Sequence, residues 1–519
     1  MTTRRSLLAG ALAAIGVAAA CAGGSSSSAT SMSPGPSTLP APDMSAPVVR
    51  APSPDPRVGL KAGLQDAGEA IWNLRKVSHT PSPAHFAGIT NSDLAFSGTD
   101  VIQGNYNGFQ IWDVSDPTHP VLRDATLCPA SQSDVSVYKN LLFVSAEAPT
   151  ARLDCGANAP RETVSRDRIR GVRIFDISDI DHPKYLANVQ TCRGSHTHTV
   201  VNDPNDQDNV YIYISGTSSV RPSAELPGCI ADATDPNTSL FRIEVIKVPL
   251  AHPEQAAIVS SPRIFADAAN PMGLTNRLGH GASPADTGAN GRGGRGGRGG
   301  GGRGRGRGLA PNATAADSAQ FNFNIALASV TQLGVSASKT DSSRYDKSVD
   351  SLARAFGVAR PPRPAPRGAL TQCHDITAYP AVGLAGGACA GMGLLLDIHD
   401  TPHPRRIAAV ADSNFSFWHS ATFSNDGSMV LFSDEWGGGG AAYCRKDDPK
   451  NWGADAIFKI VNGQMVFQAY YKMPAPQTQL ENCVAHNGSL IPIPGRTVMV
   501  QAWYQGGLSM FEWTDPAHP

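Results

Sequence analysis

The chain has 519 residues, and its 43 Lys and Arg residues nearly balance its 44 Asp and Glu residues, for a formal net charge of −1. This balance argues against a nucleic-acid-binding protein, which needs a clustered excess of positive charge. With 52 glycines and 40 prolines, the chain is also too rich in turn formers for a helical bundle.

Residues 1–21 have the layout of an export signal. Arg4 and Arg5 precede an apolar run that ends at Ala20, an order typical of secretory signals, and the start of this segment resembles a twin-arginine signal. Cys21 follows a run of alanines, as in a bacterial lipobox, and is the predicted lipidation site. An ordinary signal-peptidase site is the alternative. Residues 22–58 are predicted to form a disordered tether rich in Ser, Pro and Ala.

The rest of the chain, residues 59–519, contains a repeat that is marked by its turns. Short strands with alternating apolar residues run into turns that end in His-Pro, at 116–120, 179–183, 400–404 and 515–519. Further strands follow, and four strands per repeated unit predict an all-β fold, a β-propeller. Six blades are expected, and a seventh within 309–370 is the alternative. The inner strands are predicted to begin at Ser92, Ser133, His198, His374, His419 and His486.

Two segments lie outside this regular pattern. Residues 72–77 are expected to form a strand that completes the last blade and closes the ring, because an open sheet edge invites aggregation. Residues 264–370 are predicted to be an insertion within the propeller. Its Gly/Arg tract at 291–308 has no apolar residues with which to form a core, and we expect it to be disordered. A tolerated loop insertion is the main interpretation, and adhesion to an anionic surface polymer is the alternative.

The strand-and-turn segments resemble a known family. Residues 111–117 and 174–179 are similar to the LVIVD-repeat proteins, which are mostly bacterial surface or secreted β-propellers. The resemblance implies the fold and says little about function. Together with the export signal, it leads us to expect a monomer in the cell envelope, on its periplasmic or extracellular face. Its contact with the membrane would be a lipid anchor only. Its partner would be an unknown surface protein or small-molecule ligand, and not a nucleic acid.

Histidines occupy one repeat position in four of the units: His198, His374, His419 and His486. Because the inner strands of a propeller line its axial channel, equivalent positions form a ring around the axis. Neutral imidazoles in such a ring can bind copper or zinc, and His196 can extend the set. A structural ring, in which each imidazole bonds to the next blade, is the alternative. The histidines of the His-Pro turns are expected to be structural: His119, His182, His252, His403 and His518.

Carboxylates are predicted near the same face, because Glu147 and Glu435 both end second strands. His419 together with the stretch Ser433–Gly437 is similar to part of the selenium-binding protein/methanethiol oxidase family. Those proteins are propellers whose activity is linked to copper and to thiol oxidation. The resemblance implies a metal or active site with His419, and with Glu435 as the catalytic candidate. It covers this stretch only, and the family's Cys-rich segment is not recognisable here.

Apart from Cys21, the cysteines number eight, an even number that suits disulfides in an oxidising compartment. Four of them lie just before an inner strand, and four lie in the loop after a second strand. Both kinds of loop emerge on one face of a propeller, so the two sets can meet. The predicted pairs are Cys128–Cys155, Cys192–Cys229, Cys373–Cys389 and Cys444–Cys483.

Two functions therefore follow from the sequence. The first is a cell-surface binding or interaction scaffold that uses the disulfide-braced face. The second is a copper- or zinc-dependent oxidoreductase, with His198, His374, His419 and His486 as ligands and Glu435 as ligand or base.

Overall fold

The computed structural model describes residues 51–63, 66–233, 235–264, 349, 351–355, 372–389, 391–436 and 444–519. The chain divides into two units, Met1–Pro36 and Ser37–Pro519, and all described residues belong to the second. The predicted signal, the tether up to residue 50 and the Gly/Arg tract lie outside the described residues. No helix in the described part of the chain has both the length and the apolar character needed to cross a membrane.

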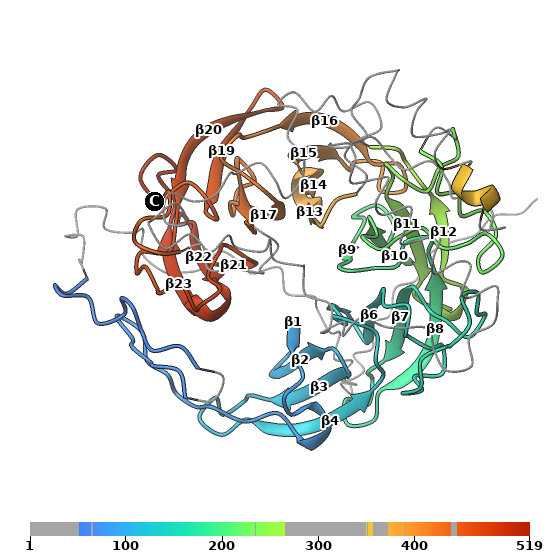
Figure 1. Ribbon diagram of the computed structural model, residues 1–519, viewed down its shortest axis with the longest axis horizontal. Helices are drawn as coiled ribbons and strands as arrows, with labels where there is room; N and C mark the ends of the chain where they lie inside the picture. Colours follow the sequence, from blue (N-terminus) through green and yellow to red (C-terminus); the bar gives the residue numbers. More distant parts are fainter. Residues whose placement is uncertain are drawn as a thin grey trace, which may run out of the picture. The chain divides into compact units, whose positions relative to one another are not determined.

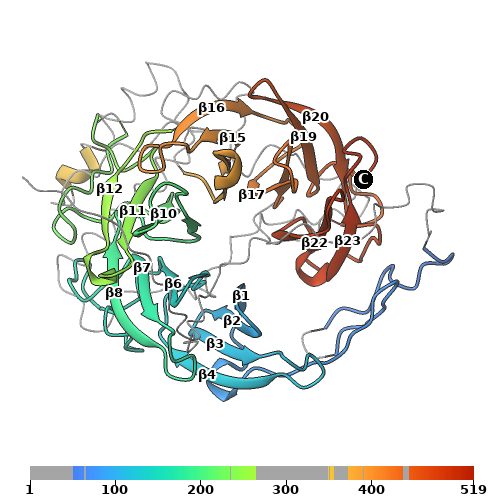
Figure 2. The same cartoon turned by 180° about the vertical axis from the view of Figure 1, so that it is seen from behind.

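The described strands form six antiparallel sheets around a central axis, which confirms the predicted six-bladed β-propeller (Figure 1). Figure 2 shows the same ring from the other side. Blades 1 to 3 consist of β1 (Asn91–Ser97), β2 (Asp100–Asn105), β3 (Gly108–Asp113) and β4 (Val121–Leu127); β5 (Val135–Tyr138), β6 (Leu141–Ala146), β7 (Gly171–Asp176) and β8 (Lys184–Gln190); and β9 (Thr199–Val201), β10 (Asn209–Ile214), β11 (Glu244–Pro249) and β12 (Ala257–Ser260).

Blades 4 to 6 follow in the same order. They consist of β13 (Asp375–Tyr379), β14 (Leu384–Cys389), β15 (Met392–Asp397) and β16 (Arg405–Val410); β17 (Trp418–Phe423), β18 (Met429–Asp434), β19 (Asp455–Val461) and β20 (Gln464–Tyr471); and β21 (Gly488–Ile491), β22 (Val498–Ala502) and β23 (Leu508–Glu512). Short 3₁₀ helices occur at η1 (Ala84–Phe86), η2 (Pro253–Gln255), η4 (Pro380–Val382) and η5 (Tyr504–Gly506).

The burial of each strand follows from its place in the blade. The second strands β6 and β18 are buried at every position, because sheets pack against both of their faces. The outer strand β4 is partly exposed along its length. In all five four-stranded blades the register shifts once between the third and fourth strands. Such a bulge increases the local twist that a blade needs.

The apolar core lies between successive blades. Five clusters of buried side chains join blades 1 and 2, 2 and 3, 3 and 4, 4 and 5, and 5 and 6. At the seam between blades 6 and 1, by contrast, apolar side chains remain exposed on both sides. Phe96 of β1 is 64% exposed and Leu508 of β23 is 66% exposed.

The expected closing strand is not formed. Residues 72–77 are described but are not part of a strand, and the sixth sheet has three strands. Asn73 has a φ of 56°, a left-handed conformation that interrupts an extended strand. The N-terminal segment is held instead by isolated hydrogen bonds. Gly59 N donates to Pro476 O at 3.1 Å, and Ser78 Oγ donates to Pro117 O at 2.7 Å.

The four predicted disulfides are all present: Cys128–Cys155, Cys192–Cys229, Cys373–Cys389 and Cys444–Cys483. The predicted insertion separates β12 from β13. Within 264–370 the structure describes residues 264, 349 and 351–355, of which 349 and 351–355 are helical. None of these residues adds a strand to a sheet, and the seventh-blade segment is otherwise outside the described residues.

Candidate metal centre at the channel mouth

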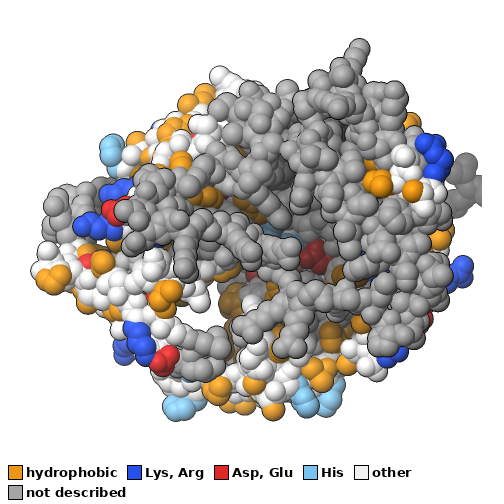
Figure 3. Space-filling view, viewed as in Figure 1, with side chains coloured by type: hydrophobic (Ala, Val, Ile, Leu, Met, Phe, Trp, Pro, Cys, Tyr) orange, Lys and Arg blue, Asp and Glu red, His pale blue; other side chains and the backbone are white. Residues whose placement is uncertain are grey.

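Four histidine rings form a continuous arc across blades 3 to 6. The ring centroids are 4.6 Å apart for His196 and His374, 4.1 Å for His374 and His419, and 4.2 Å for His419 and His486. Figure 3 shows histidine and acidic side chains together in the central hollow. We call these four residues the imidazole arc. Three of the four predicted ring histidines are therefore together, and the fourth place belongs to His196.

Hydrogen bonds between blades show which positions are equivalent. Thr197 Oγ1 donates to His374 O at 2.8 Å, and Ser420 Oγ donates to His486 O at 3.3 Å. In each case a hydroxyl directly after a ring residue reaches the ring residue of the next blade. Ser92 Oγ makes the same bond to Gln132 O. In this register the six ring residues are Asn91, Gln132, His196, His374, His419 and His486.

The predicted register was thus wrong for the first three blades. His198 lies two residues beyond the ring position and turns toward blade 2 instead. Its Nδ1 is 2.8 Å from Ser145 Oγ and 3.3 Å from Asp134 Oδ2, and its ring meets Phe143 edge-on. Residues 193–198 precede β9 and are irregular, so strand alternation does not define their register.

Buried groups at the end of β18 position His419. The Asp434 carboxylate accepts backbone N–H groups of Ser416 at 3.0 Å, Phe417 at 2.8 Å and Gly453 at 2.9 Å. Ser433 Oγ is 2.6 Å from Ser420 Oγ. Asp434 and Ser433 are both fully buried. The segment that carries His419 is therefore held on both sides of the histidine, as a preorganised site requires.

Glu435 lies beside the arc, as predicted. Its Oε2 is 3.8 Å from His419 Nε2, and its Oε1 accepts a hydrogen bond from the Tyr504 hydroxyl. The Tyr504 ring lies 4.6 Å from the His486 ring, so a phenol continues the arc beyond its last imidazole. Tyr504 has a φ of 51°, an uncommon conformation for a residue with a side chain. Strain of this kind often occurs at functional sites.

Glu147 occupies the equivalent position in blade 2, two residues after a buried serine. It binds the other end of the arc, where His196 Nδ1 is 2.6 Å from Glu147 Oε1. Thr217 Oγ1 donates to its second oxygen at 2.6 Å. Gly194 allows this approach: its φ is +72°, and a Cβ there would lie 2.8 Å from the Glu147 Cα. A carboxylate thus flanks each end of the arc.

The histidines of the imidazole arc differ in the direction in which their pKa values are shifted. Burial lowers the pKa of His486 to about 4. Burial and the neighbouring imidazoles lower the pKa of His419 well below its usual value. Burial also lowers the pKa of His196, but the hydrogen bond to Glu147 and the charges of Glu147, Asp375 and Glu435 together outweigh that effect, so the pKa is raised. His419 and His486 are therefore neutral imidazoles, the form that binds metals.

The donor atoms fit a borderline metal ion. Two overlapping sets have ligand atoms that all lie within 4.8 Å of one another: His374, Asp375 and His419, and His419, Glu435 and His486. Ligands bound to one zinc or copper ion at about 2.0–2.2 Å lie at most about 4.4 Å apart, so small shifts would suffice. Nδ1 of the fully buried His419 has no hydrogen-bond partner. An orphaned buried nitrogen costs about 1–3 kcal/mol, which a bound ion would offset.

The histidines of the His-Pro turns lie elsewhere and have local partners. Their Nδ1 atoms pair with a carboxylate of the same turn at 2.9–3.1 Å, in His119, His182, His252, His403 and His518. All five side chains are more than half exposed. This placement fits the structural role predicted for them.

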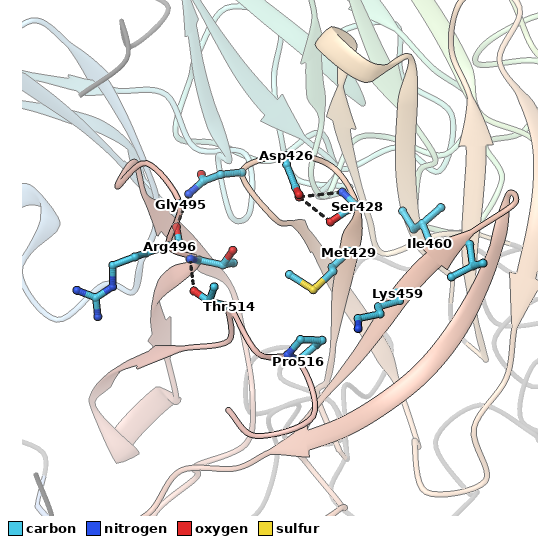
Figure 4. A pocket seen from close by; sticks show the side chains of 12 residues that line it. Asp426, Ser428, Met429, Lys459, Ile460, Gly495, Arg496, Thr514 and Pro516 are labelled. Carbon is cyan, nitrogen blue, oxygen red and sulfur yellow. Dashed lines mark hydrogen bonds between the residues drawn. The ribbon is translucent and has the colours of Figure 1, made fainter. Parts of the chain in front are cut away.

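A cavity of about 430 Å³ lies apart from the imidazole arc, at the hairpin turns of blades 5 and 6 (Figure 4). The residues that line it include Met429, Lys459 and Pro516. Asp426 accepts hydrogen bonds from Ser428, so its carboxylate is already used within its own turn. No residue of the imidazole arc lines this cavity, and we do not assign it to the site.

Fold and site together define a six-bladed β-propeller with an arc of imidazoles around its axis, of which His419 is fully buried and the other three are half-buried. No protein-family model matches the chain, and a sequence comparison with curated proteins gives no match. Comparison with solved structures gives distant propellers. Hydrazine synthase of Kuenenia stuttgartiensis matches with a TM-score of 0.39 and 6% identity, over 81% of this chain and 83% of the other.

Two further structures are similar at the same level. A hypothetical selenium-binding protein from Sulfolobus tokodaii matches with a TM-score of 0.38 and 8% identity, over 80% of this chain and 69% of that one. The periplasmic gluconolactonase of Pseudomonas aeruginosa matches with a TM-score of 0.39 and 11% identity, over 79% and 81%. At these identities the similarity concerns the propeller fold alone.

Proposed function

We propose that this protein binds a copper or zinc ion within the imidazole arc and is a metal-dependent oxidoreductase. One observation carries the proposal: Nδ1 of His419 is buried without a partner. The imidazoles of His374 and His486 lie on both sides of it. Bound copper would supply one-electron redox chemistry. His374, His419 and His486 would hold the ion, and Glu435 would act as a ligand or as a base that accepts a substrate proton.

The test is metal analysis of purified protein loaded with one equivalent of Cu²⁺ or Zn²⁺ and then desalted. We expect stoichiometric metal in the wild type and none in the double variant His419→Ala, His486→Ala. The matched control replaces two turn histidines, His119→Ala and His403→Ala, and should retain the metal. Failure of the wild type to retain either metal, or equal retention by the ring variant, would refute the proposal.

Oxidation follows as a second assay on the loaded protein. The similarity of His419 and Ser433–Gly437 to the selenium-binding protein/methanethiol oxidase family suggests small thiols as the first substrates to try. The variant Glu435→Gln should retain the metal better than it retains activity. Equal loss of both would make Glu435 a ligand and not a base.

A second candidate function is a binding scaffold on the cell surface, exported as an LVIVD-type lipoprotein through Cys21. The four disulfides brace the loops of the face that carries the arc, which supports a rigid binding surface. Its partner would be a surface protein or a small molecule, bound by a monomer. Labelling with radioactive palmitate, compared between wild type and Cys21→Ala, tests the anchor.

A further inference from the structure

Polar side chains face each other across the seam between blades 5 and 6. On blade 5 they form a row in neighbouring strands, where Asp455 of β19 is paired with Ser433 of β18 and Tyr471 of β20. On blade 6, Gln501 of β22 is paired with Ser509 of β23. The Tyr471 hydroxyl forms a hydrogen bond with the Ser509 side chain, so the two rows meet at their outer end.

The apolar core of this seam fixes the direction of the polar side chains. Ile457 and Met499 belong to the buried cluster that joins the two blades. Because side chains alternate along a strand, Asp455, two residues before Ile457, also points to blade 6. For the same reason Gln501, two residues after Met499, points to blade 5. The two side chains therefore enter the seam from opposite sides.

Hydrogen bonds also join the two rows at their inner end. Ser420 Oγ lies 2.6 Å from Ser433 Oγ and donates to His486 O at 3.3 Å. Gln501 Nε2 donates to the same carbonyl oxygen at 2.7 Å. The side chains of Asp455 and Gln501 are therefore enclosed by polar groups that are bonded to one another at both ends of the seam.

The oxygen atoms inside this enclosure have no partner. Asp455 and Gln501 are both fully buried. Within the described part of the chain, neither carboxylate oxygen of Asp455 accepts a hydrogen bond, and neither does Oε1 of Gln501. Every unsatisfied buried acceptor costs free energy. Three such oxygens in one seam therefore indicate a ligand that the protein chain itself does not supply.

Packing does not require a carboxylate at this place. Ser145 of β6 corresponds to Ser433, because each lies two residues before a glutamate of the site. The partner of Ser145 on the next strand is Val172, which is fully buried. Asp455 thus introduces a charge where blade 2 has an apolar side chain, and this exception points to a role other than packing.

We infer that a calcium ion binds between blades 5 and 6, with the carboxylate oxygens of Asp455 and Oε1 of Gln501 as ligands. Carboxylate and amide oxygens are ligands that calcium takes in proteins, in flexible geometry. Magnesium usually keeps several of its waters, and an enclosed seam favours the ion that loses them. Burial and the charge of Asp434 raise the pKa of Asp455 well above its usual value, so the ionised carboxylate needs a cation. The inference does not depend on the metal proposed for the imidazole arc.

The experiment is equilibrium dialysis of full-length protein, freed of metal with EGTA, against radioactive calcium. We expect one-to-one binding and a higher melting temperature in CaCl₂ than in EGTA. Asp455→Asn should weaken calcium binding at least tenfold and abolish the difference in melting. Asp455→Val places the residue type of blade 2 in the seam. It should also lose the ion, yet melt no lower than metal-free wild type, which guards against a folding artefact.

Two controls separate this site from the rest of the molecule. Glu435→Gln removes a carboxylate of the imidazole arc and should leave calcium binding unchanged, as should Asp116→Asn in an exposed turn. Absence of calcium binding by the wild type would overturn the inference, and so would equal binding by Asp455→Asn. Equal stabilisation by MgCl₂ at the same concentration would also overturn it. Loss of calcium in Glu435→Gln alone would place the ion in the arc instead.

Discussion

Two sets of repeated histidines, the imidazole arc and the His-Pro turns, occupy opposite physical environments. A turn histidine such as His182 has an 82% exposed side chain and pairs with Asp179 at 3.0 Å in its own turn. The His419 side chain is 1% exposed, and the Glu435 carboxylate, 3.8 Å from its Nε2, follows the next strand, β18. The recurrence of a histidine in the sequence therefore does not distinguish a candidate site residue from a turn residue. Burial and the absence of a partner in the same turn distinguish the two.

The largest expected difference is in stability, between losing the Asp434 carboxylate beside the imidazole arc and losing the Asp116 carboxylate in a His-Pro turn. Asp434→Ala removes the acceptor of three buried backbone N–H groups beside the arc. We expect a loss of about 3–5 kcal/mol in the free energy of unfolding, measured by denaturant titration at constant m-value. Asp116→Ala, in an exposed turn, should cost much less. Similar losses in the two variants would contradict the division between a built site and a turn.

The next contrast is in the response to acid. Burial lowers the pKa of His198 to about 3, so between about pH 6.5 and 3 the unfolded chain takes up a proton at this site and the folded protein does not. Stability contributed by neutral His198 is therefore present above pH 6.5 and is lost as the pH falls, by up to about 1.4 kcal/mol per pH unit. The variant His198→Gln should show a shallower loss in metal-free protein. His182→Gln should run parallel to wild type.

A finer contrast lies within the arc itself. The hydrogen bond and charge of Glu147 raise the pKa of His196 against the effect of burial, whereas burial lowers that of His486 to about 4. NMR titration of the metal-free protein should find His196 protonating at much higher pH than His486. Glu147→Gln should lower the pKa of His196 and leave that of His486 nearly unchanged. A shift of both would mean that the arc titrates as one unit.

The smallest expected effect belongs to a turn. The His403 side chain is 67% exposed and pairs with the Asp400 carboxylate of its own turn. His403→Ala should change the free energy of unfolding by no more than about 0.5 kcal/mol. Thermal melting is enough to check this. A loss of several kcal/mol would show that the turn histidines also contribute to the core.

The repeated turns made the propeller predictable. In Asp116–Pro120 the Asp116 carboxylate accepts the Thr118 N–H at 2.9 Å. Because the two residues are only two positions apart, the sequence alone predicts this turn. The disulfides were predictable for a related reason, since loops of one face can meet. The closing strand was not, because an alternating pattern at 72–77 does not reveal the left-handed conformation of Asn73.

The site was only partly predictable. In the observed register each ring residue is followed by a small polar residue that can bond to the next blade: Ser92, Ser133, Thr197, Asp375, Ser420 and Asn487. That signal does not choose between His196 and His198, because Thr197 follows the one and Thr199 follows the other, and both hydroxyls bond to the next blade. Tyr504 carries no such signal. It belongs to a single 3₁₀ turn outside the repeat and meets Glu435 only through tertiary packing.

The order of the disulfides has a consequence for how the molecule matures. Each bonded cysteine pairs with the next one along the chain, at separations of 27, 37, 16 and 39 residues. If Cys21 is lipidated or removed with the signal, a polypeptide that enters an oxidising compartment N-terminus first meets every correct partner before any wrong one. Sequential oxidation alone then yields the native bonds, without reshuffling by an isomerase.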